Sequence, residues 1–387
     1  MNTVSDAGST HPPPITAAPS GGPGVVLTGA HGFLGWHTRV ALREAGVLTR
    51  VLPLGAPFDV ARAAETLSGA DRIVHLAGVN RGTDGDIAEG NVLLARQVSD
   101  ALSRCEHPPP LVVFANSVQS GNGSVYGEAK ARAAEALTVA ADNVGARFEN
   151  VRLPNLFGEH GRAHYNSVTA TFCHQLAHGG EPVVHHDREL VLLHAQNAAE
   201  LLIGNLSAAA ASAREVVSSV GALLDELRGM AAAYRGGEIP DIRLPFQRDL
   251  FNTYRSSAFG PEAPFVLDRR TDARGSFVEV VRTHGGSGQH SFSTTVPGAS
   301  RGDHYHRRKV ERFTVLSGTA TISLRRLFFD QVLEFAVSGE NPMSIDMPTM
   351  WAHKITNTGQ DVLFTSFWAN EPFNAQQPDT SAEAVQS

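Results

Sequence analysis

A glycine-rich turn constrains the fold of this chain more than any other feature of its sequence. The apolar run Val25–Leu27 is typical of a buried parallel strand, and it leads into TGAHGFLG (residues 28–35) and then into helical sequence. In such a turn the first Gly permits a tight bend, the second lets backbone approach a pyrophosphate, and the third lets helix pack on strand. The context predicts a dinucleotide-binding fold, and an ordinary strand–helix turn is the alternative.

Two more buried runs continue the pattern, RIVHLAGVNR (72–81) and LVVFANS (111–117). Because they alternate with helical sequence, we expect an α/β doubly wound Rossmann domain with a parallel sheet, whose ligands lie at the carboxyl ends of the strands. Further along, residues 206–236 are Ala-rich and favour a helix that ends at Gly236-Gly237. The Gly-Pro breaks of FGPEAPF then place a domain boundary near Gly260.

The character of the sequence changes after that boundary. Runs such as SFVEVVR, FTVLSGTATISLRR and VLFTSFWA are short and partly alternating, with Gly and Pro between them, which is typical of an all-β domain. We therefore expect a disordered leader at residues 1–23, an α/β domain at 24–260, an all-β domain at 261–378 and a disordered tail at 379–387.

Candidate catalytic residues follow the third buried run. Ser117 ends this run, and Tyr126 and Lys130 stand four residues apart soon after it, so that a helix would put both on one face. A Lys ammonium beside a phenol favours the phenolate and lowers the pKa of the phenol, which suits proton transfer at neutral pH. Ser117 could hydrogen-bond the same substrate carbonyl. The Y-x-x-x-K spacing is common by chance, so its meaning depends on the glycine-rich turn and on Ser117.

The composition excludes several classes of function. A net charge of −7 argues against a general nucleic-acid binder, and the absence of a run of about 20 apolar residues argues against a membrane span. The N-terminus has neither the basic start nor the apolar core of a secretory signal. Cys105 and Cys173 are the only cysteines, which implies reduced thiols and no disulfide framework. We expect a cytoplasmic enzyme.

Residues 25 to about 205 resemble the extended short-chain dehydrogenase/reductases, through TGAHGFLG, HLAGVNR, RLPNLFG (152–158) and the Ser117–Tyr126–Lys130 set. The resemblance implies that Tyr126 donates a proton, that Lys130 lowers its pKa and orients the ribose, and that Ser117 holds the substrate oxygen. It implies a nicotinamide dinucleotide bound by Thr28, Gly29, Gly32, Phe33, Leu34, Gly35, Asp59, Leu76, Ala77, Gly78, Tyr126, Lys130 and Pro154. It also implies that Asn80, Arg81 and Asn155 bind a nucleotide sugar.

Two departures from that family concern the cofactor and the loop after Ser117. The second expected strand ends in RVLPLG (50–55) without an acid for the ribose 2′-hydroxyl, which favours NADP(H) over NAD. No Arg follows to hold a 2′-phosphate, so NAD stays open. The spacing from Ser117 to Tyr126 is short for the extended members, which predicts a trimmed loop over the site.

Three potential metal ligands lie together in RGDHYHRRKVE (301–311). His304 and His306 would share one face of a strand, and Glu311 could fold back across a turn. The stretch from Gly298 to Gly318 resembles the first motif of the cupins, which are double-sheet jelly rolls, and PTMWAHKITN (348–357) resembles the second, with Met350 where Gly is usual. This resemblance implies a divalent metal held by His304, His306, Glu311 and His353. Zinc is the expected ion, although nickel, iron and manganese also suit these ligands, and a metal-free cupin with a hydrogen-bonded His cluster is the alternative.

The same domain resembles the cupin-fold sugar epimerases that act on 4-keto-deoxyhexoses, through DARGSFVEVVR (272–282), QHSFS and RGDHYH. In those metal-free enzymes the His that corresponds to His304 is the catalytic base. His304 therefore has two possible roles, as a ligand or as a base.

From about residue 24 to 380 the chain resembles the bifunctional capsular polysaccharide synthesis enzymes of the CapF type, with YGEAK, YNSVTATFCH, DLFNTY, GSFVE and QQPDT in common. The resemblance implies C3 epimerisation of a UDP-2-acetamido-2,6-dideoxy-4-ketohexose by the cupin domain and NADPH-dependent reduction of the C4 ketone by the first domain, towards UDP-N-acetyl-L-fucosamine. Gln196-Asn197 replaces an acidic pair of that family, which leaves the sugar open. A homodimer is expected, because cupins often pair through their strands.

Three other interpretations stay open. The chain could be a single-activity nucleotide-sugar reductase with a structural, dimerising cupin, or a related enzyme that serves a secondary-metabolite sugar. It could also be a non-catalytic sensor of NADP, against which the intact Tyr126 and Lys130 argue.

Overall fold

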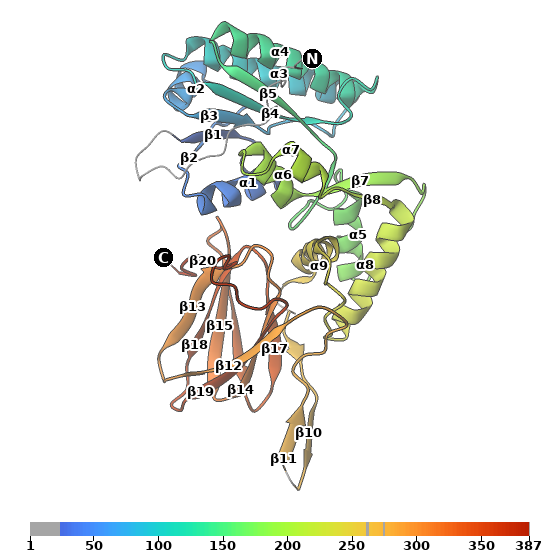
Figure 1. Ribbon diagram of the computed structural model, residues 1–387, viewed down its shortest axis with the longest axis vertical. Coiled ribbons are helices and arrows are strands. Elements are labelled where there is room, and N and C mark those ends of the chain that lie inside the picture. Colours follow the sequence, from blue (N-terminus) through green and yellow to red (C-terminus); the bar gives the residue numbers. More distant parts are fainter. Residues whose placement is uncertain (1–23, 261–262, 274, 387) are drawn as a thin grey trace, which may run out of the picture. The chain divides into compact units, whose positions relative to one another are not determined.

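The computed structural model describes residues 24–260, 263–273 and 275–386 (Figure 1). By their contacts they form two compact units. Unit 1 contains the described residues up to Phe157 together with Tyr165–Ser167 and Glu189–Ser218, and unit 2 contains Gly158–His164, Val168–Arg188 and the described residues from Ser219 onward. The expected leader, residues 1–23, lies outside the described residues. The boundary expected near residue 260 follows the change from helices to strands, whereas the contacts group residues 219–260 with those strands.

Unit 1 is built on a five-stranded parallel sheet with the order β2-β1-β3-β4-β5. Its strands are β1 (Val25–Thr28), β2 (Thr49–Val51), β3 (Arg72–His75), β4 (Leu111–Ser117) and β5 (Arg147–Leu153). Its helices are α1 (Phe33–Glu44), α2 (Val60–Leu67), α3 (Asp84–Arg104), α4 (Val125–Asn143), α6 (Ala195–Leu202) and α7 (Ala208–Ser212). A second sheet contains β6 (Asn155–Phe157), β7 (Glu189–His194) and β8 (Val216–Ser219). The expected doubly wound Rossmann domain is confirmed.

Apolar side chains on both faces of the parallel sheet explain its position between two layers of helices (Figure 1). On one face, Val25 and Leu27 of β1 pack with residues of α1 and α6. On the other face, Val26 packs with residues of α2, α3 and α4. Because successive strand residues point to opposite faces, a strand buried on both sides is mostly apolar, as Val25–Leu27 of β1 are.

Gly35 shows why the turn after β1 needs glycine. A Cβ atom at this position would lie 2.0 Å from the carbonyl oxygen of Gly29 and 2.8 Å from the backbone of Ala30. The first turn of α1 can therefore approach the turn only if residue 35 has no side chain. This agrees with the role expected for the third Gly of the pattern.

Among its described residues, unit 2 contains three helices, α5 (Val168–Ala177), α8 (Val220–Arg235) and α9 (Pro245–Ala258), and two five-stranded sheets with antiparallel pairing. One sheet has the order β12-β19-β14-β17-β9 and the other β16-β15-β18-β13-β20. Their strands are β9 (Phe265–Val266), β12 (Gln289–Thr295), β13 (Ser300–Tyr305), β14 (Glu311–Ser317), β15 (Thr319–Arg326), β16 (Val332–Ser338), β17 (Met343–Met347), β18 (Trp351–Asn357), β19 (Leu363–Ala369) and β20 (Ser381–Ala382). The hairpin of β10 (Arg269–Asp272) and β11 (Gly275–Val278) extends away from them (Figure 1).

The core of the strand region lies between its two sheets. Phe313, Val315 and Ile345 of one sheet pack with Ile322 and Ile355 of the other. This double-sheet arrangement confirms the all-β, jelly-roll class expected after residue 260. Among the described residues, no helix has both the length and the apolar character that crossing a membrane requires.

Two segments differ from expectation. The stretch 206–236 is not one helix: α7 ends at Ser212, β8 follows, and α8 begins only after Ser219, whose hydroxyl caps it by accepting from the Ala222 N–H. The β-branched and hydroxyl residues of Val216–Ser219 favour a strand and a helix cap over helix interior. The expected disordered tail also carries structure as far as residue 386, because β20 pairs with β13 and Val385 is buried.

A buried ion pair joins the helices and strands of unit 2. Arg312 of β14 donates from Nε and Nη2 to the Asp346 carboxylate of β17 at 2.6 and 3.1 Å, and both side chains are 2% exposed. Arg312 also donates to the carbonyl of Gly237, just after α8, while Arg255 of α9 donates to the carbonyl of Met347 at 2.7 Å. Burial alone would raise the pKa of Asp346, but the charge and hydrogen bonds of Arg312 lower it.

Asp346→Asn is therefore expected to lower the free energy of unfolding by about 3–5 kcal/mol, because it leaves the Arg312 guanidinium buried without a carboxylate. Chemical denaturation of the full chain, followed by tryptophan fluorescence, measures the change. Asp225→Asn is the matched control, since the Asp225 side chain is 78% exposed and its ion pair with Arg228 should contribute little. Equal, small losses in both variants would show that the Arg312 pair does not stabilise the unit.

Candidate functional site

The first candidate site lies in unit 1, at the carboxyl end of β4. Ser117 is the last residue of this strand, and Tyr126 and Lys130 lie in the first turns of α4, which begins after the cap residue Ser124. The Ser124 hydroxyl accepts from the N–H of Gly127 at 3.0 Å. The structure thus brings Ser117 and Tyr126 together across the short loop 118–124.

Gly127 makes this short loop possible. A Cβ atom at residue 127 would lie 2.3 Å from the carbonyl oxygen of Gln119 and 2.2 Å from the side chain of Asn122. The N–H of Gly121 also donates to the Gly127 carbonyl at 3.0 Å. The loop can therefore pack directly on α4, beside Tyr126, only because residue 127 is glycine.

Tyr126 is half-buried beside Ser117. Burial raises the pKa of the Tyr126 phenol, and a hydrogen bond with Ser117 partly offsets this effect. The Ser117 hydroxyl is itself held by the N–H of Gln119, which donates to its oxygen at 3.2 Å. Such a pair can hold a substrate carbonyl oxygen between two hydroxyl groups.

Lys130 is buried on α4 and faces the strand rather than solvent. Its Nζ donates to the carbonyl of Ala115 at 2.8 Å and lies 4.0 Å from the ring centroid of Phe114. Burial lowers the pKa of Lys130 to about 7. The expected action of Lys130 on the pKa of Tyr126 stays a prediction, since the contacts of Lys130 here are with β4.

Two residues of this environment, Phe114 and His75, were not predicted. The His75 ring stacks on Phe114 with 5.4 Å between centroids, and its Nδ1 lies 2.7 Å from the hydroxyl of Thr28. That hydroxyl oxygen also accepts from the N–H groups of Leu76 and Ala77 at 3.1 and 3.2 Å. It therefore donates its own proton to Nδ1 of His75. The contact follows from strand pairing, because His75 and Phe114 are opposite each other in β3 and β4, which local spacing does not reveal.

Other residues expected to bind cofactor or substrate lie on several elements of unit 1. Gly32 is the N-cap of α1, so the helix N-terminus carries no side-chain cap. Asp59 caps α2 through the N–H groups of Ala61 and Arg62. The buried Oδ1 of Asn80 has no hydrogen-bond partner among the described residues. Arg81 lies over the ring of Tyr165 at 5.9 Å, and Asn155 donates to the carbonyl of Val191 at 3.2 Å.

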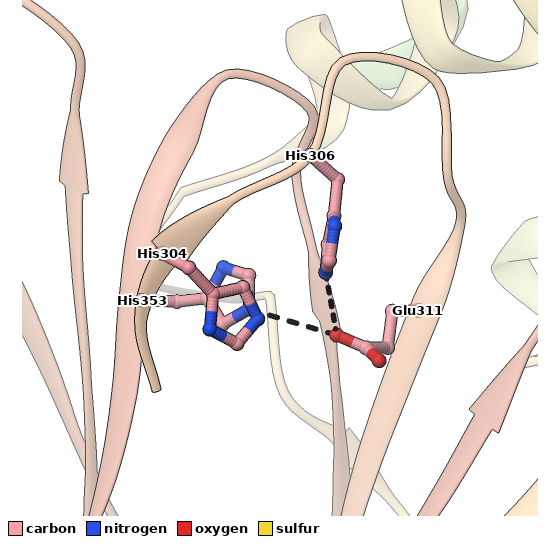
Figure 2. Close-up of side chains that lie close together, drawn as sticks. All are labelled: His304, His306, Glu311 and His353. Atoms are coloured by element: carbon pink, nitrogen blue, oxygen red, sulfur yellow. Dashed lines mark hydrogen bonds and ion pairs between the residues drawn. The ribbon is translucent and has the colours of Figure 1, made fainter. Parts of the chain in front are cut away.

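The second candidate site lies in unit 2, inside the double sheet, and contains His304, His306, Glu311 and His353 (Figure 2). One ligand atom from each of the four residues lies within 4.8 Å of the others. His304 and His353 are paired across β13 and β18, while Glu311 begins β14 in the opposite sheet. His306 follows the end of β13. The structure thus brings together all four residues of the predicted set.

The hydrogen bonds of His306 and His353 determine which ring nitrogen faces the cluster. Nδ1 of His306 donates to the carbonyl of Asp379, and Nδ1 of His353 donates to the carbonyl of Trp351 at 3.1 Å. Since a carbonyl can only accept, each neutral ring carries its proton on Nδ1. The Nε2 atoms, which then carry lone pairs, face Oε2 of Glu311 at 3.1 and 3.5 Å (Figure 2).

This geometry fits a divalent cation. Lone pairs of two imidazoles face a carboxylate oxygen, and a positive ion among them would satisfy all three. Nε2 of His353 is buried and has no hydrogen-bond partner in the part of the chain that the structure describes. Ligating histidines commonly donate their other N–H to a backbone carbonyl, as these two do. Burial, together with the charges of the neighbouring histidines, lowers the pKa of His304 to about 4.

Asp379 is a supporting residue that the sequence did not single out. Besides the contact of its carbonyl with His306, its carboxylate accepts from the N–H groups of Arg307, Arg308 and Lys309 at 3.0, 2.9 and 2.8 Å. It thereby holds the loop that carries His306. The shared stretch QQPDT contains this residue and was the one available signal.

Family models match both parts of the chain. Residues 25–217 match the NAD dependent epimerase/dehydratase family, and residues 270–381 match the polysaccharide biosynthesis C-terminal domain. The first range contains Ser117, Tyr126 and Lys130, and the second contains the whole histidine–glutamate cluster.

Two similar proteins align with nearly the whole chain, and a third aligns with a shorter part of it. The UDP-2-acetamido-2,6-beta-L-arabino-hexul-4-ose reductase of Pseudomonas aeruginosa is 33% identical over 93% of this chain and 98% of its own length. The spore coat polysaccharide biosynthesis protein SpsL of Bacillus subtilis is 28% identical over 29% of this chain and 81% of its own. The crystal structure of the capsular polysaccharide assembling protein CapF from Staphylococcus aureus, 30% identical, covers 93% of this chain and 100% of its own with a TM-score of 0.60. The chain therefore belongs to the CapF-type family of nucleotide-sugar reductases and epimerases, in which a dinucleotide-binding domain precedes a polysaccharide biosynthesis C-terminal domain.

Proposed function

We propose that this chain is a bifunctional enzyme that epimerises C3 of a UDP-2-acetamido-2,6-dideoxy-4-ketohexose and then reduces its C4 ketone with NADPH. One observation carries the proposal: the same chain holds the Ser117–Tyr126 pair beside a buried Lys130 and, separately, a buried four-ligand cluster. The Pseudomonas relative, a reductase of a UDP-linked hexul-4-ose, supports the substrate class.

In the reductase site, bound NADPH would supply the hydride that adds to C4 of the sugar. The carbonyl oxygen then needs a proton, and the half-buried Tyr126 phenol can supply it. Ser117, already hydrogen-bonded to Tyr126, can donate to the same oxygen and orient the ketone. Asn80, whose buried Oδ1 has no partner among the described residues, is the proposed substrate contact of this site, together with Arg81 and Asn155.

In the cluster, a bound divalent ion would supply Lewis-acid polarisation of a carbonyl oxygen. His304, His306, Glu311 and His353 would hold it, and three imidazoles with one carboxylate suit zinc, although nickel, iron and manganese also fit. The C3 proton lies alpha to the C4 ketone, so stabilising the enolate oxygen makes it removable. The epimerised sugar keeps its C4 ketone, which is the group that the reductase site requires.

The proposal also includes a homodimer in the cytoplasm. The edge strand β12 is exposed along most of its length, with Phe292 72% exposed, which supports pairing with a second copy. Cys105 and Cys173 are both unpaired, as is usual in a reducing compartment.

Incubation with the UDP-4-keto sugar in D₂O tests the division of labour. Without NADPH, the full chain is expected to exchange the C3 proton for deuterium and to form the C3 epimer, both visible by NMR. Addition of NADPH should then produce the reduced sugar together with oxidised cofactor. Reduction without any C3 exchange would contradict the epimerase half and favour a single-activity reductase with a structural cupin.

A further inference from the structure

A buried hydrogen bond joins two segments of unit 2 that are far apart in sequence. The hydroxyl of Thr349, in the loop before β18, donates to the carboxylate of Glu159 at 2.8 Å. The two side chains are 3% and 0% exposed. Glu159 follows β6 and the stretch RLPNLFG, so it comes from a part of the sequence that otherwise belongs to the reductase signature.

The next residue of the loop, Met350, contacts a proposed ligand. Its N–H donates to the carbonyl of His306 at 2.6 Å. Met350 has a φ of 61°, in the left-handed region that favours glycine. Non-glycine residues held in this region concentrate at functional sites, where the surrounding structure enforces them.

Trp351 bonds both to His160 and to His353 of the cluster. Its indole N–H donates to Nε2 of His160 at 3.4 Å, and its carbonyl accepts the Nδ1–H of His353 at 3.1 Å. His160 also has a positive φ, of 62°, and its backbone N–H donates to the hydroxyl of Ser256 on α9 at 3.1 Å. We call Thr349–Trp351 the bridge loop, because each of its residues bonds either to Glu159 or His160, or to a histidine of the cluster.

We propose that Glu159 and His160 are positioning residues of the His304–His306–Glu311–His353 cluster and act through the bridge loop. They offer no ligand atom to the cluster themselves. Glu159 holds Thr349, which places the Met350 N–H against His306, and His160 holds Trp351, which places the carbonyl that orients the His353 ring. The inference rests on the proposed metal site, and it adds residues that neither cupin-like motif contains.

The hydrogen bond between Trp351 and His353 gives the bridge loop a role beyond packing, because it orients a ligand ring. Nδ1–H donation to the Trp351 carbonyl is what turns Nε2 of His353 towards Glu311. A shift of the bridge loop would therefore rotate a ligand ring and change the field around the ion. Outer partners of ligating histidines typically change metal affinity by about 10–100-fold when they are removed.

The test uses the full chain, stripped of metal and titrated with Co²⁺, whose visible absorption reports ligand geometry. Glu159→Ala is expected to bind Co²⁺ about 10–100-fold more weakly than the unsubstituted chain, with an altered spectrum. Glu159→Gln should restore most of the affinity, because its amide oxygen can still accept from Thr349. Thr349→Val should weaken binding as Glu159→Ala does, and the double variant should show no further loss.

A second pair of variants examines His160 without removing a buried carboxylate. Asn tolerates a positive φ, and its side chain is too short to place an acceptor where Nε2 of His160 lies. His160→Asn therefore removes the hydrogen bond from Trp351 with little backbone strain. His160→Asn and Trp351→Phe are expected to change the Co²⁺ spectrum in the same, non-additive way. Glu181→Ala, an exposed change in the same unit, is the control and should leave affinity and spectrum unchanged.

The outcomes distinguish this inference from the proposed function. If the unsubstituted chain binds no Co²⁺, the metal site itself is wrong and the inference falls with it. If that chain binds Co²⁺, but folded Glu159→Ala and His160→Asn bind it with unchanged affinity and spectrum, only the positioning role is overturned. Thermal unfolding of each metal-free variant establishes whether it is folded.

Discussion

Tyr126→Phe is expected to lower the rate of ketone reduction about 10²–10⁴-fold, the usual contribution of a positioned proton donor. The substitution removes the phenol hydroxyl that bonds to Ser117, but it keeps the ring that packs in the half-buried site. Hydride can then still approach C4, whereas the developing alkoxide has lost its proton source. NADPH oxidation in single-turnover experiments with the UDP-4-keto sugar measures the loss.

The same variant contains its own control. Deuterium exchange at C3 should continue at the original rate, because the second site contains no residue of α4. Ser117→Ala should reduce the rate less, since the phenol remains as a donor. NADPH oxidation at the full rate in Tyr126→Phe would refute the assignment of Tyr126 as the proton donor.

The second large effect is expected at the cluster, where His353→Ala should abolish both tight metal binding and C3 exchange. His353 is 0% exposed and its Nε2 faces Glu311, so its loss removes one ligand and leaves Glu311 with fewer partners. Metal content by elemental analysis should fall together with thermal stability, since metal binding favours the folded state. Reduction of a pre-epimerised ketone should persist.

His186→Ala is the matched control, because His186 is exposed and should affect neither metal content nor exchange. His304→Ala separates the two roles open to that residue. A ligand role predicts loss of metal and of stability together, whereas a role as base predicts a variant that keeps its metal and loses only C3 exchange. A purified metal-free enzyme that still exchanges the C3 proton would refute the metal mechanism altogether.

The reductase half could be predicted closely because its signals are local. The turn at residues 28–35 lies within the β1–α1 unit, and the strand end at Ser117 and the spacing of Tyr126 and Lys130 lie within the β4–α4 unit. The surroundings of Lys130 could not be predicted in the same way. Phe114 and the Ala115 carbonyl meet Lys130 only when α4 packs on β4, and His75 joins them by strand pairing.

The cluster shows the same limit more strongly. Spacing and resemblance predicted its four residues, but not the partners that orient their rings, which come from Trp351 and Asp379. Met350, the departure from the usual Gly of the second motif, has the backbone conformation that makes Gly usual there. The disordered tail expected from residue 379 was likewise inferred from local sequence alone. In the sequence Asp379 is part of a polar segment, and only the fold brings three N–H groups of the loop that carries His306 to its carboxylate.

The order of segments along the chain has a consequence for synthesis on the ribosome. The chain passes from one unit to the other after residues 157, 164, 167, 188 and 218, so the first parts of unit 2 are made before unit 1 is complete. Residues Val168–Arg188 include the buried Phe172, Cys173 and Leu176 of α5. Because α5 packs on α8 and α9, roughly 4–16 seconds would pass at ordinary translation speeds between the synthesis of α5 and the completion of α9. During that interval the apolar side of α5 lacks its final environment, and a nascent chain in this state is a natural client for a chaperone.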